Sequence, residues 1–213
     1  MRSIIRYAVS LSLLLIPCAA QQQWEIGGAL GYGIYKNQKV SSDTVEGTAG
    51  FRHGLAFSIN GGQDLYRYIG GEIRYTYRAN DLKLNSEGTN VRFSGEAHAI
   101  HYDLLLNTAP KGSRIRPFVA LGGGVKVFRG TDRESEFQPL NRLALLTRTH
   151  QVKPLISLGA GVRIALSRNA ILRLDIRDYI TPFPDEVIVP VPPTRLNGWL
   201  HDFVPMIGVG FVF

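Results

Sequence analysis

The sequence predicts an all-β fold: an eight-stranded antiparallel up-and-down transmembrane β-barrel that forms one domain over residues 21–213. Three observations predict it. Apolar residues alternate with glycine, alanine and polar residues along eight segments. Short connections between the segments alternate with long ones along the chain. The N-terminal residues have the pattern of an export signal. The chain of 213 residues is 45% hydrophobic, which is enough to build one folded domain.

The first 20 residues are predicted to be a signal peptide. Two arginines precede an apolar run over residues 8–16, and small residues lead up to Ala20. Cleavage between Ala20 and Gln21 would remove Cys18, the only cysteine, so the exported protein would have no disulfide. We therefore expect export to the outer membrane of a Gram-negative cell envelope.

The first strand shows the alternation most clearly. Trp24, Ile26 and Leu30 share one face, whereas Glu25 and Gly27 lie on the other. A face made of glycine, alanine and one acid suits a narrow polar interior, and the apolar face suits lipid. Seven further segments repeat this period, over residues 52–59, 65–77, 90–107, 115–127, 152–164, 172–177 and 202–213.

The fourth segment, residues 90–107, alternates least regularly. Glu96 and His98 share a parity with Ile100, although the two groups call for opposite faces of the wall. A β-bulge near Ala99 would switch the faces, and it would place Glu96 in the interior.

Connection length depends on the end of the predicted barrel. The short connections are residues 60–64, 108–113 and 167–169, and the long ones are 36–49, 79–90, 130–150 and 180–198. An outer-membrane barrel has this asymmetry, with both termini and the short turns in the periplasm. A secreted soluble barrel that holds a ligand remains the alternative.

Three glycine-rich segments carry a resemblance to a known family. They are residues 116–124, 154–163 and 208–213. Over residues 24–213 the chain resembles the eight-stranded outer-membrane barrels that include the transmembrane domain of OmpA and the Opa-like proteins. The resemblance implies that the barrel-insertion machinery is a partner, and that it reads a C-terminal signal matched here by Ile207, Val209, Phe211 and Phe213.

Charged residues predicted to face the interior form a candidate ionic network. Its members are Glu25, Glu72, Arg74, Glu96, Lys126, Arg163, Arg173, Asp175 and Arg177. Eight strands leave an interior that side chains fill, and buried charges must pair there. We interpret the network as structural, while a gate in a narrow pore and a small-ligand site remain alternatives.

No catalytic, cofactor or metal site is expected. His98 and His101 are three residues apart on a strand and so face opposite sides. No His-x-Ser pair of a lipid-modifying barrel enzyme is present, and the glycines at 122–124 open no phosphate-binding loop. The net charge of +7 is scattered without a basic cluster, which argues against nucleic acid as a partner.

The function predicted from the sequence is a non-enzymatic outer-membrane barrel that is structural, or that binds surfaces through its long extracellular loops. Outer-membrane lipid and lipopolysaccharide are expected partners, with loop residues such as Arg133 and Arg142 near lipid phosphates. An extracellular ligand would bind the loops. A small gated pore is the first alternative, and a soluble ligand-binding barrel or a lipid-modifying enzyme the second.

Overall fold

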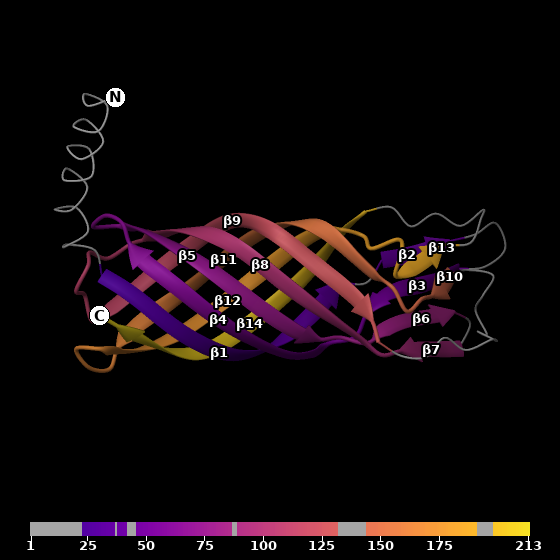
Figure 1. Cartoon of the computed structure of the whole chain (residues 1–213), viewed down its shortest axis with the longest axis horizontal. Coiled ribbons are helices and arrows are strands. Elements are labelled where there is room, and N and C mark those ends of the chain that lie inside the picture. Colours follow the sequence, from indigo (N-terminus) through magenta and orange to yellow (C-terminus); the bar gives the residue numbers. More distant parts are fainter. Residues whose placement is uncertain (1–22, 37, 42–45, 87–88, 132–143, 191–197) are drawn as a thin grey trace, which may run out of the picture.

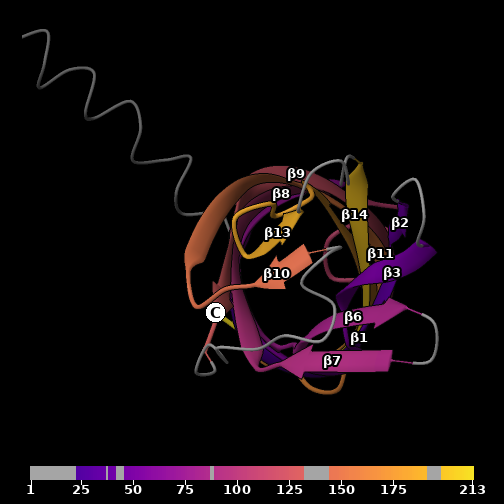
Figure 2. The ribbon, with the colours of Figure 1, turned by 90° about the vertical axis from the view of Figure 1, so that its right-hand side faces the viewer.

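The computed structural model describes residues 23–36, 38–41, 46–86, 89–131, 144–190 and 198–213, and its main body is a closed barrel (Figures 1 and 2). Eight antiparallel strands follow one another around the wall in the order β1-β14-β12-β11-β9-β8-β5-β4. They are β1 (Gln23–Lys36), β4 (Gly54–Asp64), β5 (Ile69–Ala79), β8 (Gly95–Asn107), β9 (Ile115–Gly130), β11 (His150–Ala165), β12 (Ala170–Pro182) and β14 (Trp199–Val212). The predicted fold class is confirmed. The described part of the chain has no helix long and apolar enough to cross a membrane.

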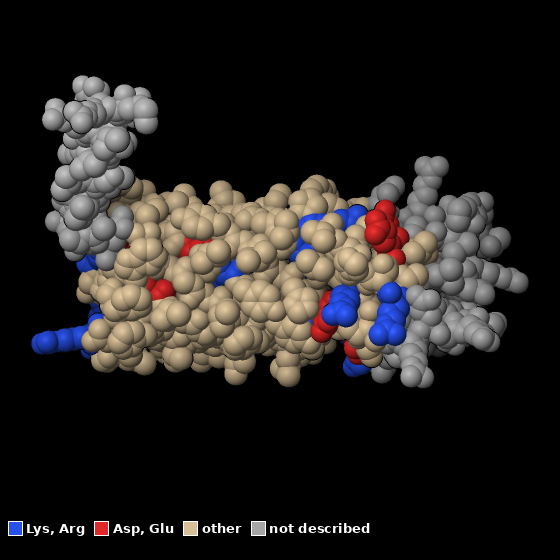
Figure 3. Space-filling model, in the orientation of Figure 1, with Lys and Arg blue, Asp and Glu red and all other residues tan. Residues whose placement is uncertain are grey.

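The period of two in the sequence becomes the two faces of the wall. In β1, Ile26 and Leu30 expose more than half of their surface on the outside, while Glu25 and Ala29 are buried inside. Barrel strands of 11 to 16 residues are long enough to cross a bilayer, which needs about 9–11 tilted residues. Figure 3 accordingly shows a wall made mainly of uncharged side chains, with most of the visible acidic and basic residues towards one end and further basic residues at the other.

Both termini of the barrel lie at one end, which we call the terminal end (Figure 1). The three short connections are there, at residues 65–68, 108–114 and 166–169. Trp24 and Phe213 exchange two backbone hydrogen bonds of 2.9 and 3.0 Å, which join the first strand to the last residue of the chain. The split between short and long connections is as the sequence predicts.

The opposite end, which we call the extended end, is more structured than the prediction of long loops. Six short strands stand beyond the barrel: β2 (Gln38–Ser41), β3 (Glu46–Phe51), β6 (Leu82–Ser86) and β7 (Thr89–Phe93) form a four-stranded sheet, and β10 (Ala144–Leu146) pairs with β13 (Ile188–Pro190). The sheet prolongs the barrel wall, because β5–β8 and β6–β7 keep the same register. A core of apolar side chains seals the base of this end: Tyr35, Phe51, Leu82, Ala97, Phe128, Phe183, Val187, Ile188 and Leu200.

Two local predictions about the strands are wrong. Residues 60–64 are not a turn, because β4 continues to Asp64 with its polar side chains facing the lumen. No bulge occurs near Ala99, since the register of β8 with both neighbours is unbroken. The described wall has its bulge elsewhere: between the pairs Ala56–Arg78 and Phe51–Leu82, four residues (52–55) face three (79–81).

One proline lies in the middle of a barrel strand. Pro205 is the seventh of the fourteen residues of β14. It is paired with Ile176 on the β12 side, while the ladder with β1 is interrupted between the pairs Gly31–Met206 and Ile34–Phe203. Because proline has no N–H to donate, it interrupts pairing on one side only.

Candidate functional site

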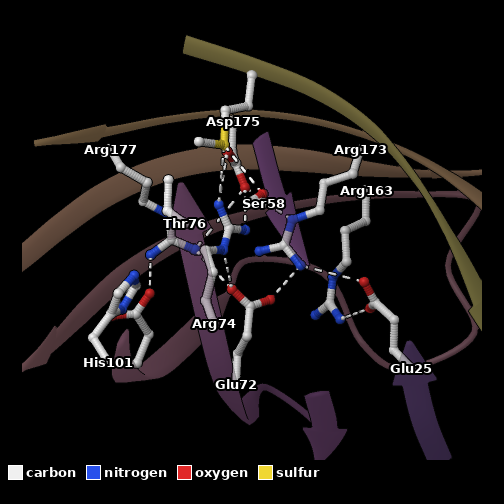
Figure 4. A network of polar contacts seen from close by, with 12 residues as sticks. Glu25, Ser58, Glu72, Arg74, Thr76, His101, Arg163, Arg173, Asp175 and Arg177 are labelled. Atoms are coloured by element: carbon white, nitrogen blue, oxygen red, sulfur yellow. Dashed lines mark hydrogen bonds and ion pairs between the residues drawn. The ribbon is translucent and has the colours of Figure 1, made fainter. Parts of the chain in front are cut away.

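The lumen is filled by a chain of ion pairs, which is the candidate site (Figure 4). Inward positions of β1, β5, β8, β11 and β12 supply its side chains, so residues far apart in sequence meet on the barrel axis. We call the following set the central network: Glu25, Glu72, Arg74, Asp103, Arg163, Arg173, Asp175 and Arg177. Each of these side chains is at least about nine-tenths buried.

Glu72 accepts hydrogen bonds from three arginines. Its Oε1 accepts from Arg74 Nε at 2.9 Å and from Arg177 Nη2 at 3.3 Å, and its Oε2 accepts from Arg173. Asp175 lies opposite, where its Oδ2 accepts from Arg74 Nη2 at 2.7 Å and from Arg173 Nε at 2.9 Å. Two arginines are therefore shared by two carboxylates, and no single bond can be released without disturbing the others.

A second branch runs through Asp103. Arg177 donates to its Oδ2, and its Oδ1 is 3.0 Å from His101 Nδ1. The other ring nitrogen of His101 is 3.3 Å from the hydroxyl of Tyr179, which lies 3.0 Å from the Thr76 hydroxyl. This branch connects the ionic network to neutral hydroxyl groups nearer the extended end of the barrel.

Towards the terminal end the network opens into a vestibule. Glu25 joins Arg173 to Arg163, with distances of 3.2 and 3.0 Å, and Arg163 then reaches within 3.6 Å of Asp64. Arg116 donates to Asp64 at 2.5 Å. The cavity at this mouth has a volume of about 210 Å³, and most of the residues that line it are polar or charged, beside Ala165, Ile171 and Val212.

Towards the extended end two cations share one acid. Lys126 Nζ is 2.6 Å from Asp202 Oδ2, and Arg78 Nη2 is 3.1 Å from Asp202 Oδ1. Both cations also lie over the Tyr35 ring, at 4.9 Å for Arg78 and 5.0 Å for Lys126. The aromatic face offsets the missing second carboxylate through cation–π attraction.

Charge balance explains how so many ions can be buried. The central network with Asp64 and Arg116 contains five acids and five arginines. Burying an unpaired ion costs several kcal/mol, and pairing with additional hydrogen bonds offsets that cost. Glycine makes room for this packing: a Cβ at Gly33 would overlap the Arg78 guanidinium, and one at Gly159 would overlap the Arg177 side chain.

Two predicted members lie elsewhere. Glu96 is on the outer face of the wall, because β8 has no bulge, and its partners there are Arg129, Tyr77 and His98. Lys126 is in the lumen but binds Asp202 rather than the central network. The other seven predicted residues come together as one connected group.

Sequence reasoning missed five buried charges of the lumen. They are Asp64, Arg78, Asp103, Arg116 and Asp202. All five have the inward parity of their strands. Arg116 and Asp202 lie inside predicted segments, and Arg78 is one residue beyond one, so the alternation itself carried their signal. Asp64 was assigned to a turn, and Asp103 follows the position where a bulge was expected.

The histidines form no metal centre in the part of the chain that the structure describes, where no group of three metal-binding side chains is found. His98 points outward and its Nδ1 is 2.8 Å from the Tyr75 hydroxyl, while His101 points into the lumen. His53 Nδ1 accepts a hydrogen bond from the Tyr35 backbone, and His201 pairs with Asp178.

The four residues of the predicted assembly signal share the outer face of the last strand. Ile207, Val209, Phe211 and Phe213 each expose more than half of their surface. The Phe211 and Phe213 rings are 6.2 Å apart. Their role as an assembly signal stays a prediction. The predicted cleavage site at Ala20 and Gln21 lies outside the described residues, as do Arg133 and Arg142.

At the extended end, Asp185 links a loop to the barrel rim. Its Oδ1 accepts from Lys153 Nζ at 2.7 Å and from Gln151 Nε2 at 2.9 Å. The hydrogen bond from Lys153, followed by that from Gln151, holds the pKa of Asp185 below its usual range.

Comparisons with known proteins identify outer-membrane barrels of similar fold. The sequence model of the family described as "Outer membrane protein beta-barrel domain" matches residues 8–199. Among curated proteins, no sequence matches the chain. The solved structures of similar fold include the outer membrane protein OprG from Pseudomonas aeruginosa, with a TM-score of 0.61 and 14% identity over 90% of this chain and 95% of that one.

Two more solved structures are similar to the chain. Neisserial surface protein A has a TM-score of 0.53 and 11% identity, over 89% of this chain and 96% of that one. The outer membrane protease OmpT from Escherichia coli has a TM-score of 0.44 and 10% identity, over 90% and 96%. At these identities the first two similarities bear on the fold alone, and the third is too weak to bear on function.

Proposed function

The chain belongs to the outer membrane protein β-barrel family, and from that premise we propose that it is a non-enzymatic barrel that is closed to solutes and presents a binding surface outside the cell. In this arrangement the terminal end, with its short turns, faces the periplasm, and the extended end faces outward. Residues 1–20 serve as a cleaved signal peptide, and the C-terminal strand is read by the insertion machinery.

The extended end is the observation that carries the proposal. A barrel that only spans the membrane needs short turns at both ends, yet this one continues into six further strands. The apolar core at their base is almost fully buried, so the strands stand on a rigid support. Binding residues are commonly placed on such segments above a rigid scaffold.

The lumen supports the closed state. Side chains of the central network cross the barrel between β1, β5, β8 and β12, and the apolar core lies above them. Moving a solute through would require several buried ion pairs to break together, each at a cost of several kcal/mol. The same residues provide stability to the wall instead.

Trimming the extended end tests the proposal. Because Asp81 and Ser94 continue the register of β5 and β8, residues 82–93 can be replaced by a two-residue Asn-Gly turn. Cells displaying the wild type are expected to bind immobilised matrix protein or glycosaminoglycan above cells without it. The trimmed barrel is expected to keep its heat-sensitive mobility in gels and to lose that binding.

A control variant replaces residues 110–113 of a short turn at the other end. Its binding should equal that of the wild type. Binding that survives trimming of a folded barrel, or no binding by the wild type, contradicts the proposal.

A small gated pore is the second candidate, favoured by the polar vestibule of about 210 Å³ at the terminal end. Arg163 and Glu25 line it and continue into the central network, so a gate would have to open at their ion pair. Ion conductance separates a gate from a closed barrel.

A further inference from the structure

The outer wall has an apolar groove that neither the lumen nor the extended end explains. Its volume is about 260 Å³, and its lining consists of Ile26, Ile59, Asn60, Gly61, Ile73, Tyr75 and Ile100. Gly61 forms its floor, because a Cβ there would meet only Ile73 Cγ2 at 3.7 Å. The isoleucines that border it are about half exposed and face the membrane.

The depth of the groove follows from strand register. Ile26, Gly61 and Ile73 are directly paired across β1, β4 and β5, and Ile59, Tyr75 and Ile100 form the next outward row. The shape and lining of the groove fit part of one acyl chain.

A polar cluster lies directly above the groove on the same wall. Tyr75 lines the groove and its hydroxyl is 2.8 Å from His98 Nδ1, while His98 Nε2 is 3.7 Å from Glu96. Glu96 in turn pairs with Arg129 at 3.4 Å, and the Arg129 side chain is 61% exposed. Figure 3 shows charged side chains gathered at this end of the wall.

The groove and the cluster are arranged like the two parts of a lipid molecule. The apolar groove lies inside the membrane, where an acyl chain would be, and the hydrogen-bond donors lie at the membrane boundary, where the headgroup would be. The Arg129 guanidinium bonds Glu96 through one nitrogen and is otherwise open to the outside, where its fork can bind phosphate oxygens. Aromatic and imidazole side chains at the boundary suit the headgroup level.

We propose that this groove and cluster form a specific seat for one lipid A molecule of the outer leaflet. One acyl chain lies on Gly61 between the isoleucines, and a headgroup phosphate binds Arg129 beside His98. The proposal rests on membership of the outer-membrane family and on the outward orientation of the extended end, and it does not depend on what the extended end binds.

Native mass spectrometry of the detergent-purified full chain, with lipid A as the probe, tests the seat. Gly61→Leu fills the groove, and it is expected to lower the lipid-bound fraction at least about tenfold, which corresponds to losing roughly two buried methylenes. Gly123→Leu is the matched control, because Gly123 also faces outward with open space, the nearest atom being Leu155 O at 3.5 Å, but lies outside the groove. Gly61→Val serves if Gly61→Leu does not give the heat-sensitive folded form.

The headgroup contact has its own comparison. Arg129→Gln is expected to abolish the preference for lipid A over its dephosphorylated form, whereas Arg114→Gln, an exposed arginine at the terminal end, should preserve it. Equal lipid retention by the Gly61 and Gly123 variants overturns the seat, and equal behaviour of the two arginine variants overturns the phosphate contact. A wild-type dimer that Gly61→Leu dissociates would assign the groove to a second copy of the chain and also refute the proposal.

Discussion

Replacing Glu72 by glutamine removes a carboxylate that accepts hydrogen bonds from three arginines, while keeping the shape of the side chain. Arg74, Arg173 and Arg177 all donate to it, with distances of 2.9 and 3.3 Å from Arg74 and Arg177 to Oε1. Each contact between full charges at about 4 Å is worth roughly 4 kcal/mol at an effective dielectric constant of about 20. The energy that Glu72 loses by leaving water, and its repulsion from Asp175, offset most of this sum. Breaking a buried pair by removing one partner costs about 3–5 kcal/mol, and we expect Glu72→Gln to lie in that range.

The assay is equilibrium unfolding in urea of the barrel refolded into lipid vesicles, followed by tryptophan fluorescence. Glu96→Gln is the matched control, since Glu96 lies outside the barrel and its pair with the exposed Arg129 is worth at most about 1 kcal/mol. The midpoint for Glu72→Gln should fall well below that for Glu96→Gln. Equal losses of stability in the two variants would refute the buried-network argument.

Three further predictions follow from other parts of the molecule. Gly33→Val should displace the Arg78 guanidinium from Asp202 and destabilise the barrel by about 3 kcal/mol in the same urea assay, whereas Gly28→Val, on the outer face, should cost little; equal effects would contradict the packing argument. Deleting Phe213 should reduce the folded protein recovered in outer-membrane fractions several-fold, as measured by immunoblot, while Phe57→Leu should not; unchanged recovery would refute a role in assembly. Asp185 has a lowered pKa, so its contacts stabilise the extended end above the unfolded pKa of about 3.9 and are lost as pH falls through the folded value; limited proteolysis should accelerate there in the wild type and show no such step in Asp185→Asn.

Most of the barrel could be predicted from alternation alone. Each strand must place one parity in lipid and the other in a polar lumen, so residues such as Ile26 and Glu25 report their faces directly. Seven of the nine predicted network residues do meet, because inward positions of a narrow barrel cannot avoid one another.

The wrong predictions for β8, the bulge near Ala99 and the inward position of Glu96, arose near the rim of the barrel. Residues there can be polar on either face of the wall. Glu96 and His98 are outward-facing residues at the membrane boundary, where water and headgroups tolerate charge. Their polarity in the sequence mimics an inward parity, which is why a bulge was inferred near Ala99. The true bulge at residues 52–55 was not visible, because Arg52 and His53 are exposed polar residues.

The short strands of the extended end left a weaker signal. β10 and β13 have three residues each, too few for alternation to be recognised, and Pro190 within β13 argues against a strand. Their pairing depends on contacts between residues 144–146 and 188–190, which no local pattern contains.

Planar-bilayer recording of the purified barrel tests the central claim, that the ionic network closes the lumen, most directly. The wild type is expected to give no steady conductance, because Glu25, Glu72 and Asp175 hold the arginines across the lumen. Arg163→Ala, at the vestibule, is also expected to give no steady conductance, since Arg173 still binds Glu25 in the central network. Steady conductance from the wild type that shifts in Arg163→Ala would contradict the closed barrel and show that the network is a gate.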